Sequence, residues 1–299
     1  MESNHTAFCE YQDFIGAITT WNFVVYFCII FTAVTANVML LFGIYRNPLK
    51  CFRNPTTYFI TNLAIADLLN ALYYLVQVLA TQTTYKTAYC FPAPWPRMFS
   101  AIGNVAYFIT VPSVTILALE RYVSIAHPLW HQVKVTSRLC FTCIALVWIV
   151  TATYTAIIQL INSGWAIFVT IYPSVFYLTT VLIYVLACIS IRKHRFSFST
   201  DSTKSDIAKR MTQLRLRNQN RFLTTVFIIN VVLLGGIVPI IVGTYLSNTI
   251  EGPVSSTLDV LSFLVDILFF LNMAVNPFLY IWRLPKYRKT FLVMYCCKK

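Results

Sequence analysis

The 299-residue chain is 58% hydrophobic and only 11% charged, with 23 Lys and Arg against 10 Asp and Glu. A soluble domain is usually about 25% charged, and so few charges cannot cover the surface of a soluble protein of this length. The composition excludes an ordinary soluble enzyme, a disordered chain and a disulfide-rich secreted domain, and it indicates an integral membrane protein.

Long uncharged segments follow one another along the chain. A helix needs roughly 20 residues to cross the hydrocarbon core, so the 53 residues from Leu139 to Ile191, which lack Asp, Glu, Lys, Arg and His, suit two crossings joined at Asn162-Ser163-Gly164. Only helices and closed barrels satisfy the backbone in lipid, and strands of alternating polarity are absent. We therefore predict an all-α bundle of seven transmembrane helices near residues 21–46, 55–81, 97–124, 138–161, 165–193, 218–246 and 257–282.

The basic residues predict the orientation of this bundle. Of the 23 Lys and Arg residues, all but Lys86, Arg97 and Arg121 fall in the loops and the tail on one side. The positive-inside rule makes that side cytoplasmic, which gives an extracellular tail at 1–20, a membrane domain at 21–282 and a cytoplasmic tail at 283–299 in the cell membrane. The net charge of +13 reflects this bias, so we expect no nucleic-acid partner.

Two cytoplasmic segments are predicted. The third cytoplasmic loop, about 194–217, is rich in Ser, Thr and basic residues, which suits either a solvated linker or a phosphorylatable docking segment. After the last span, apolar side chains share one helical face, which predicts an amphipathic helix on the membrane surface. That face comprises Leu284, Tyr287, Phe291 and Met294. Cys296 and Cys297 beside it are either palmitoylation sites or unmodified cysteines.

The outer side carries two candidate modifications. Asn4 begins an Asn-His-Thr glycosylation sequon, which is usable only if that end is extracellular. Cys9 and Cys90 share the same oxidising side, so we predict a disulfide between them.

The sequence contains few of the residue patterns that are typical of an enzyme. None of the four histidines falls within a predicted span, which leaves a transmembrane haem or an intramembrane zinc hydrolase unsupported. Nucleophile-elbow and phosphate-loop patterns are absent too. We therefore predict no catalytic residues and no metal or cofactor, with a sodium ion at Asp67 as the single candidate.

One acidic residue lies in the middle of a span. A buried Asp costs about 2.5–3.5 kcal/mol on insertion scales, so Asp67 requires a compensating interaction. Asn37, Asn272 and Asn276 lie at comparable depths and are expected to converge with it, with water or a cation balancing the charge. The alternative is a structural hydrogen-bond network without a switching role.

Adjacent opposite charges close the third predicted helix at Glu120-Arg121-Tyr122. They can pair with each other or reach a neighbouring helix, and an Arg at this depth can change partners when helices move. The alternative is an Arg that snorkels to the membrane surface.

The order and spacing of these residues resemble a rhodopsin-like (class A) G-protein-coupled receptor. Asn37 matches the family's helix-one Asn, NLAIAD at 62–67 its helix-two motif, and Glu120-Arg121-Tyr122 its helix-three motif. Ile125 to Leu129 resemble its second inner loop. The remaining matches are Trp148, Pro173, Pro239 and the NPFLY run at 276–280.

The resemblance implies an extracellular ligand bound among helices three, five, six and seven. The matching positions are Gly103, Asn104, Tyr107, Thr170, Tyr245 and Asp266. It also implies a shift of helix six, hinged near Gly235-Gly236 and Pro239, that opens a cytoplasmic site for a heterotrimeric G protein. The coupling positions are Glu120, Arg121, Tyr122, Arg217, Arg221 and Tyr280, and a receptor kinase and arrestin are implied as further partners.

Several family positions are altered. Pro96 stands where the family has its helix-three Cys, and Gly236-Ile237-Val238-Pro239 lacks the aromatic residue usual before the helix-six Pro. Val181 replaces a common Tyr, and Gly103 replaces the Asp of aminergic receptors. The short second outer loop without a bridge resembles the melanocortin, cannabinoid and lysophospholipid receptor group.

Two other functions stay open. A signalling-silent scaffold or decoy is compatible with the missing aromatic residue and bridge. A transporter or channel is less favoured, because the interior polar residues gather in one half of the bundle and seven spans do not suit an inverted repeat.

Overall fold

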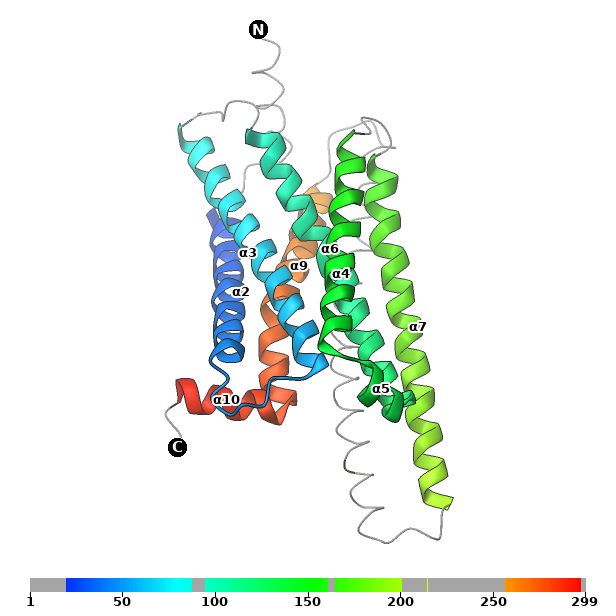
Figure 1. The fold of residues 1–299 in the computed structure, drawn as a ribbon. Helices are drawn as coiled ribbons and strands as arrows, with labels where there is room; N and C mark the ends of the chain where they lie inside the picture. The colour runs from blue at the N-terminus through cyan, green and yellow to red at the C-terminus, as the bar shows by residue number, and fades with distance from the viewer. Residues whose placement is uncertain (1–19, 88–94, 161–164, 201–213, 215–255, 297–299) are drawn as a thin grey trace.

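The structure, a computed structural model, describes residues 20–87, 95–160, 165–200, 214 and 256–296 (Figure 1). Every element within these residues is a helix. The long helices are α2 (Thr20–Arg46), α3 (Pro55–Thr87), α4 (Trp95–Ala126), α6 (Ser137–Leu160), α7 (Trp165–Thr200) and α9 (Ser256–Arg283). The short helices are α5 (Pro128–Lys134) and α10 (Pro285–Tyr295).

The all-α prediction is confirmed. In the described part of the chain, six helices are long and apolar enough to cross a membrane, and they coincide with six of the seven predicted spans. The predicted span at 218–246 lies outside the described residues. Two features differ from the prediction. The short helix α5 was not expected, and α7 continues to Thr200, past the predicted start of the loop at 194, because the intervening sequence holds no Gly or Pro to end it.

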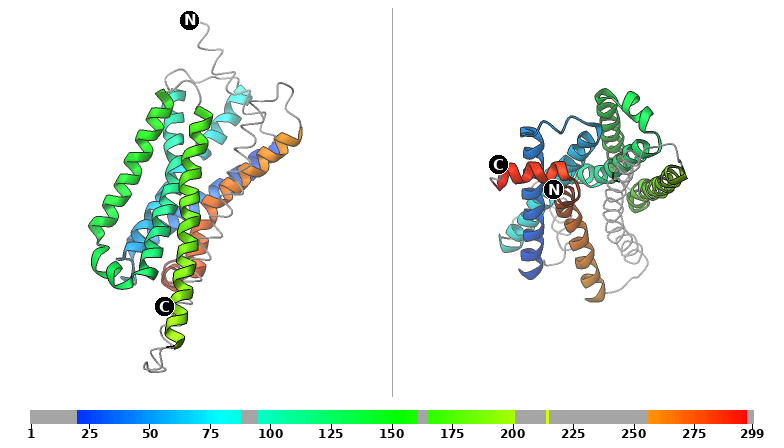
Figure 2. Two further views of the ribbon diagram at one scale, coloured as in Figure 1. Left: turned by 90° about the vertical axis from the view of Figure 1, so that its right-hand side faces the viewer. Right: turned by 90° about the horizontal axis from the view of Figure 1, so that it is seen from below.

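Helix α4 lies at the centre of the described bundle. Its apolar window is 67% buried, against 17% for the window of α6, and it packs against α3, α6 and α7 (Figure 2). On the other side, α2 packs against both α3 and α9. A helix with lipid on one side needs packing partners only on the other, and among the described long helices α4 is the one enclosed over most of its apolar window.

Buried hydrogen bonds fix the packing of the central helices. Asn62 of α3 accepts a hydrogen bond from the Trp148 indole of α6 at 2.8 Å and donates one to Ser113 of α4 at 2.8 Å. The hydroxyls of Thr115 and Thr180 join α4 to α7 at 2.7 Å. In an apolar environment such groups need partners, so these bonds favour one arrangement of the four helices.

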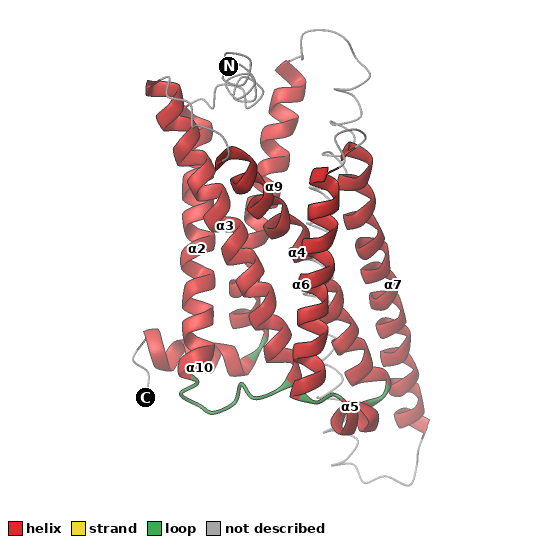
Figure 3. Ribbon diagram, turned by 45° about the horizontal axis from the view of Figure 1, so that its top comes forward, coloured by secondary structure: helices red, strands yellow, loops and turns green. Residues whose placement is uncertain are grey.

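Helix α10 lies across the end of the bundle at which α5 is also found (Figure 3). The Tyr287 hydroxyl donates to Thr57 Oγ1 at 3.1 Å, and its ring packs on Phe52 with 4.7 Å between centroids. Burial raises the pKa of Tyr287 well above its usual range, so this hydroxyl stays a donor. Tyr287 is buried while Lys286, Arg288 and Lys289 are exposed, which confirms the predicted amphipathic helix.

Candidate functional site

A polar cluster joins α2, α3 and α9 in the interior. Asp67 is fully buried and accepts a hydrogen bond from Asn276 Nδ2 at 2.7 Å. Asn37 Nδ2 donates to the Met273 carbonyl of α9 at 3.0 Å. Asn272 is also buried, at 3% exposure. The expected convergence on Asp67 is thus direct for Asn276, whereas Asn37 binds the α9 backbone nearby.

This cluster holds more acceptors than donors. Asp67 Oδ1, Asn37 Oδ1 and Asn276 Oδ1 are buried and lack a hydrogen-bond partner among the described residues, as does the Tyr280 hydroxyl. Buried oxygens are costly without a donor or a cation. One carboxylate and two amide oxygens form a ligand set that suits a hard monovalent cation or water.

An ionic cluster closes α4 at the α5 end of the bundle. Arg121 holds the Glu120 carboxylate with two bonds, Nε to Oε2 at 2.6 Å and Nη2 to Oε1 at 2.7 Å. The Thr56 hydroxyl of α3 adds a longer bond to Oε1 at 3.3 Å. The Glu120 side chain is 3% exposed and that of Arg121 19%. The structure therefore has the two adjacent charges paired with each other, and Glu120 also reaches Thr56 of the neighbouring helix α3.

His131 is a member of this cluster that the sequence reasoning missed. Its Nε2 lies 2.9 Å from Glu120 Oε1. An ionised carboxylate only accepts hydrogen bonds, so Nε2 carries the proton. Pro128 at the first position of α5 suits a helix start, and that signal could have predicted the helix but not its contact with Glu120.

The same short helix exposes an apolar patch. Leu129 is 78% exposed, Trp130 51% and Val133 73%. We call these three residues the α5 patch. Contiguous exposed apolar side chains mark contact sites for proteins or membranes, and this patch begins eight residues after Arg121, in the helix that follows α4.

At the other end of the bundle, the predicted counter-charge Asp266 already has a partner. It accepts a hydrogen bond from the Tyr26 hydroxyl of α2 at 2.9 Å. The Tyr26 ring packs on Phe263 and Phe270, with centroids 5.4 and 5.2 Å away. A ligand cation that binds Asp266 must therefore share it with Tyr26 or displace Tyr26.

A side chain from the neighbouring helix α3 occupies the space beside Gly103. A Cβ at this position would lie 2.1 Å from Cζ of Tyr73, so the Tyr73 ring occupies the place of the missing side chain. Among the other predicted ligand positions, Asn104 is half-buried and Tyr107 packs on Phe269 at 5.4 Å.

The structure describes some of the other predicted site residues and leaves the rest undescribed. Tyr122 packs against the buried core, and Cys296 is exposed. Thr170 lies in α7, but the structure does not describe its side chain. The remaining predicted positions lie entirely outside the described residues; they are Asn4, Cys9, Cys90, Arg217, Arg221, Gly235, Gly236, Pro239, Tyr245 and Cys297.

Comparison with known proteins identifies the family. The model of the 7 transmembrane receptor (rhodopsin family) matches residues 36–280, and the chain belongs to this family. The expected resemblance is confirmed, and the chain is a multi-pass membrane protein of the receptor class.

Individual relatives are distant. The substance-K receptor of Mesocricetus auratus is 29% identical over 50% of this chain and 37% of its own length. The neuromedin-U receptor 2 of Mus musculus is 28% identical over 42% of this chain and 31% of its own length. The C-C chemokine receptor type 8 of Mus musculus is 27% identical over 52% and 45%. The chain thus spans less than half the length of each of these relatives.

Proposed function

We propose that this chain is a G-protein-coupled receptor that binds an extracellular ligand among its helices and activates a heterotrimeric G protein. The observation that carries the proposal is the Glu120–Arg121 pair, held by α3 and α5 at the same end of the bundle as the exposed α5 patch. Family membership supports receptor signalling as the general role.

The mechanism rests on an exchange of partners at Arg121. In the structure its guanidinium is engaged by Glu120, which Thr56 and His131 hold in place. When the helices move, Arg121 is released and binds the G protein, and the α5 patch supplies apolar contact. A ligand drives this change only through different affinities for the two states. The receptor itself makes and breaks no covalent bond.

The proposed orientation puts α5 and α10 in the cytoplasm. The exposed basic residues of this end, such as Lys134 and Lys286, agree with the positive-inside rule. A receptor kinase and arrestin are proposed as further cytoplasmic partners, and the N-terminus is proposed to be extracellular. Helix-six movement near Pro239 stays a prediction.

A direct test uses the purified full chain in lipid nanodiscs with a set of G proteins. Guanine-nucleotide exchange above the rate with empty nanodiscs supports a signalling receptor, and an agonist should increase it. Exchange that never exceeds that rate, with any G protein or any compound of a broad library, would favour the scaffold or decoy alternative.

The ligand is not carried over from the relatives, because the names of the three receptors refer to three different ligands. The structure offers Asp266 as a carboxylate for a cationic ligand. We expect a cationic agonist from the library to lose about tenfold or more in potency on Asp266→Asn, equivalent to about 1.4 kcal/mol.

Tyr26→Phe is the matched control for this carboxylate. It removes the hydroxyl that competes for Asp266 while keeping the ring against Phe270, so the potency of the cationic agonist should be maintained or increased. The potency of a neutral agonist should be the same on both variants as on the parent. A cationic agonist with parental potency on Asp266→Asn would show that this carboxylate is not the counter-charge.

We also propose a sodium ion beside Asp67. The fit rests on three buried oxygens without partners among the described residues, Asp67 Oδ1, Asn37 Oδ1 and Asn276 Oδ1. When bound, the ion would neutralise the carboxylate and brace α2, α3 and α9 against one another, which favours the packing seen here.

Sodium should therefore raise the melting temperature of the detergent-solubilised parent more than choline at equal ionic strength. Ligand binding to the folded state alone contributes about 2.7 kcal/mol at a concentration of 100 times Kd. The sodium-specific increase should vanish in Asp67→Asn and persist in Asp266→Asn, which changes a carboxylate ten residues before Asn276 in α9. Equal melting curves in the two salts for the parent would argue for water in this cluster.

A further inference from the structure

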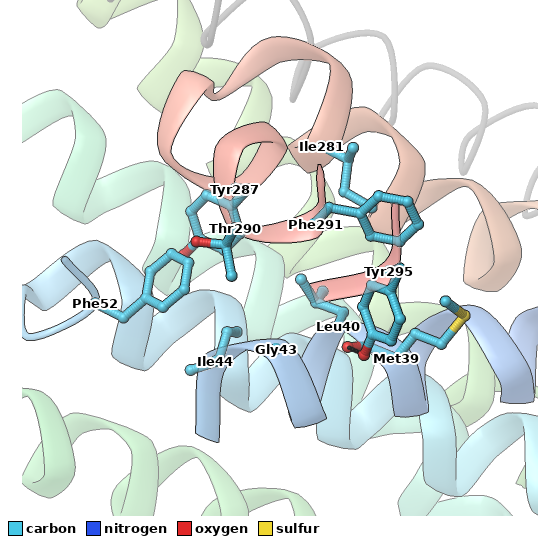
Figure 4. Close-up of a pocket in the computed structure, with 10 residues that line it drawn as sticks. All are labelled: Met39, Leu40, Gly43, Ile44, Phe52, Ile281, Tyr287, Thr290, Phe291 and Tyr295. Carbon is cyan, nitrogen blue, oxygen red and sulfur yellow. Dashed lines mark hydrogen bonds between the residues drawn. The ribbon is translucent and has the colours of Figure 1, made fainter. Parts of the chain in front are cut away.

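An apolar groove runs along the outside of the bundle between α2 and α9. It has a volume of about 540 Å³, including the part open to the surroundings. Its walls include Phe31, Thr35 and Met39 of α2, Phe278 and Ile281 of α9, and Phe291 of α10. A second hollow of about 260 Å³ at the junction of α2 and α10 shares Met39, Ile281 and Phe291 with it (Figure 4). The two hollows therefore meet at these three side chains.

The walls of this groove are fixed by packing. The Tyr295 hydroxyl donates to the Met39 carbonyl at 2.9 Å, and the rings of Phe291 and Tyr295 lie 4.9 Å apart. A Cβ at Gly43 would lie 4.0 Å from the Thr290 methyl and the Met294 sulfur, so α10 comes close to α2 at this glycine. The packing of α2, α9 and α10 therefore holds the walls of the groove in place.

The groove has the length of a lipid chain. From Phe31 to Arg46, α2 rises roughly 22 Å at 1.5 Å per residue, which exceeds the ~15 Å of hydrocarbon in one leaflet. Both α2 and α9 are candidate membrane spans. An acyl chain that enters from the leaflet at the α10 end can therefore follow the groove as far as Phe31.

Basic side chains surround the α10 end of the groove. Arg46 ends α2, Lys50 and Arg53 follow that helix, and Lys286, Arg288 and Lys289 lie on α10; all of them are exposed. The sequence has no Asp or Glu between Asp13 and Asp67 or after Asp266. The segments of α2 and α10 at this end of the groove, and the loop after α2, therefore carry basic side chains and no acidic ones.

Arg288 connects the charge to the groove. It precedes Phe291 by three residues in α10, so the two side chains lie on one face of that helix. Phe291 lines both hollows. A guanidinium at this position suits an anionic phosphate oxygen at the polar boundary of the membrane.

We propose that the groove is a binding site for one anionic phospholipid of the leaflet at the α10 end, with an acyl chain between α2 and α9 and the headgroup phosphate on Arg288. The site is separate from the ligand and coupling positions and does not depend on the signalling proposal. It is a specific site, distinct from the layer of lipid around any membrane protein, because shape and charge coincide there.

Native mass spectrometry of the full chain, titrated with phosphatidylserine or phosphatidylcholine of identical acyl chains, tests the proposal. We expect one phosphatidylserine to bind at a concentration at least about tenfold lower than phosphatidylcholine. Arg288→Gln should weaken phosphatidylserine about tenfold and leave phosphatidylcholine unchanged. Thr35→Trp, an exposed position on the groove wall, should weaken both lipids.

Matched controls lie on α6, away from the groove. Arg138→Gln removes an equally exposed cation, and Thr142→Trp adds a ring at an exposed position. Neither should change lipid binding. Melting curves of all four variants should match the parent, since none of the four side chains is buried.

Four results would overturn the site. The first three are equal binding of the two lipids, loss of phosphatidylserine in Arg138→Gln as large as in Arg288→Gln, and parental binding by Thr35→Trp. A fatty-acyl mass on the chain that disappears in Cys296→Ser and blocks phosphatidylserine binding would also overturn it, since the groove would then hold an acyl chain of the protein itself.

Discussion

Arg121→Ala should abolish agonist-stimulated nucleotide exchange while the variant reaches the cell surface at the parental level. The guanidinium is the group that Glu120 holds at 2.6 and 2.7 Å in the structure and that the G protein is proposed to take over. Loss of one member of a buried charge contact costs at least about 2 kcal/mol, or about 30-fold in the coupling equilibrium.

Two variants make this result specific. Arg138→Ala removes an exposed cation from the same end of the bundle and should signal normally. Arg121→Lys keeps the charge but loses the bidentate hydrogen bonding of the guanidinium, so it should retain a fraction of the response. Full signalling by Arg121→Ala at equal surface density would disprove the role assigned to this residue.

His131→Leu should raise signalling in the absence of agonist. Its imidazole donates to Glu120 at 2.9 Å, and a hydrogen bond to a charged group contributes about 1.5–3 kcal/mol. If this bond exists only in the resting packing, its loss shifts the ratio of active to resting receptor by about 13- to 160-fold. Agonist-free second-messenger output, normalised to surface density, measures the shift.

The amide of His131→Gln can still donate to the carboxylate, so this variant should stay near the parental basal level. Gln132→Leu changes the exposed neighbour on α5 and controls for added apolar surface. In the double variant with Arg121→Ala the raised output should disappear, because the released guanidinium is what activates. If the basal output of His131→Leu equals that of the parent, His131 does not help to hold Glu120 and Arg121 in the resting packing.

The spans were predictable because length and charge density decide whether a helix can cross a membrane. The position of Asp67 was informative for a related reason: a carboxylate in lipid requires a partner, and Asn276, 209 residues away, supplies it. The Glu120–Arg121 pair is adjacent in the chain, so only its choice of partner was open.

Contacts that depend on packing were not predictable. Asn37 indicates which face of α2 turns inward, but nothing in the sequence shows that Tyr26 of the same helix meets Asp266, 240 residues away. The bond from His131 to Glu120 depends on how α5 packs against the end of α4. The extension of α7 to Thr200 does not follow from charge, because charged residues mark where a helix leaves the membrane, and a helix can project past the membrane surface.

The Tyr73 ring over Gly103 limits how this receptor could change its ligand class. An acidic residue introduced at 103 alone would meet an aromatic ring at 2.1 Å from its Cβ, before it could meet any amine. A smaller residue at 73 alone would leave an empty space and gain no charge. Amine recognition through position 103 therefore requires that the Tyr73 ring be moved or replaced as well, whereas recognition through Asp266 requires no change at either position.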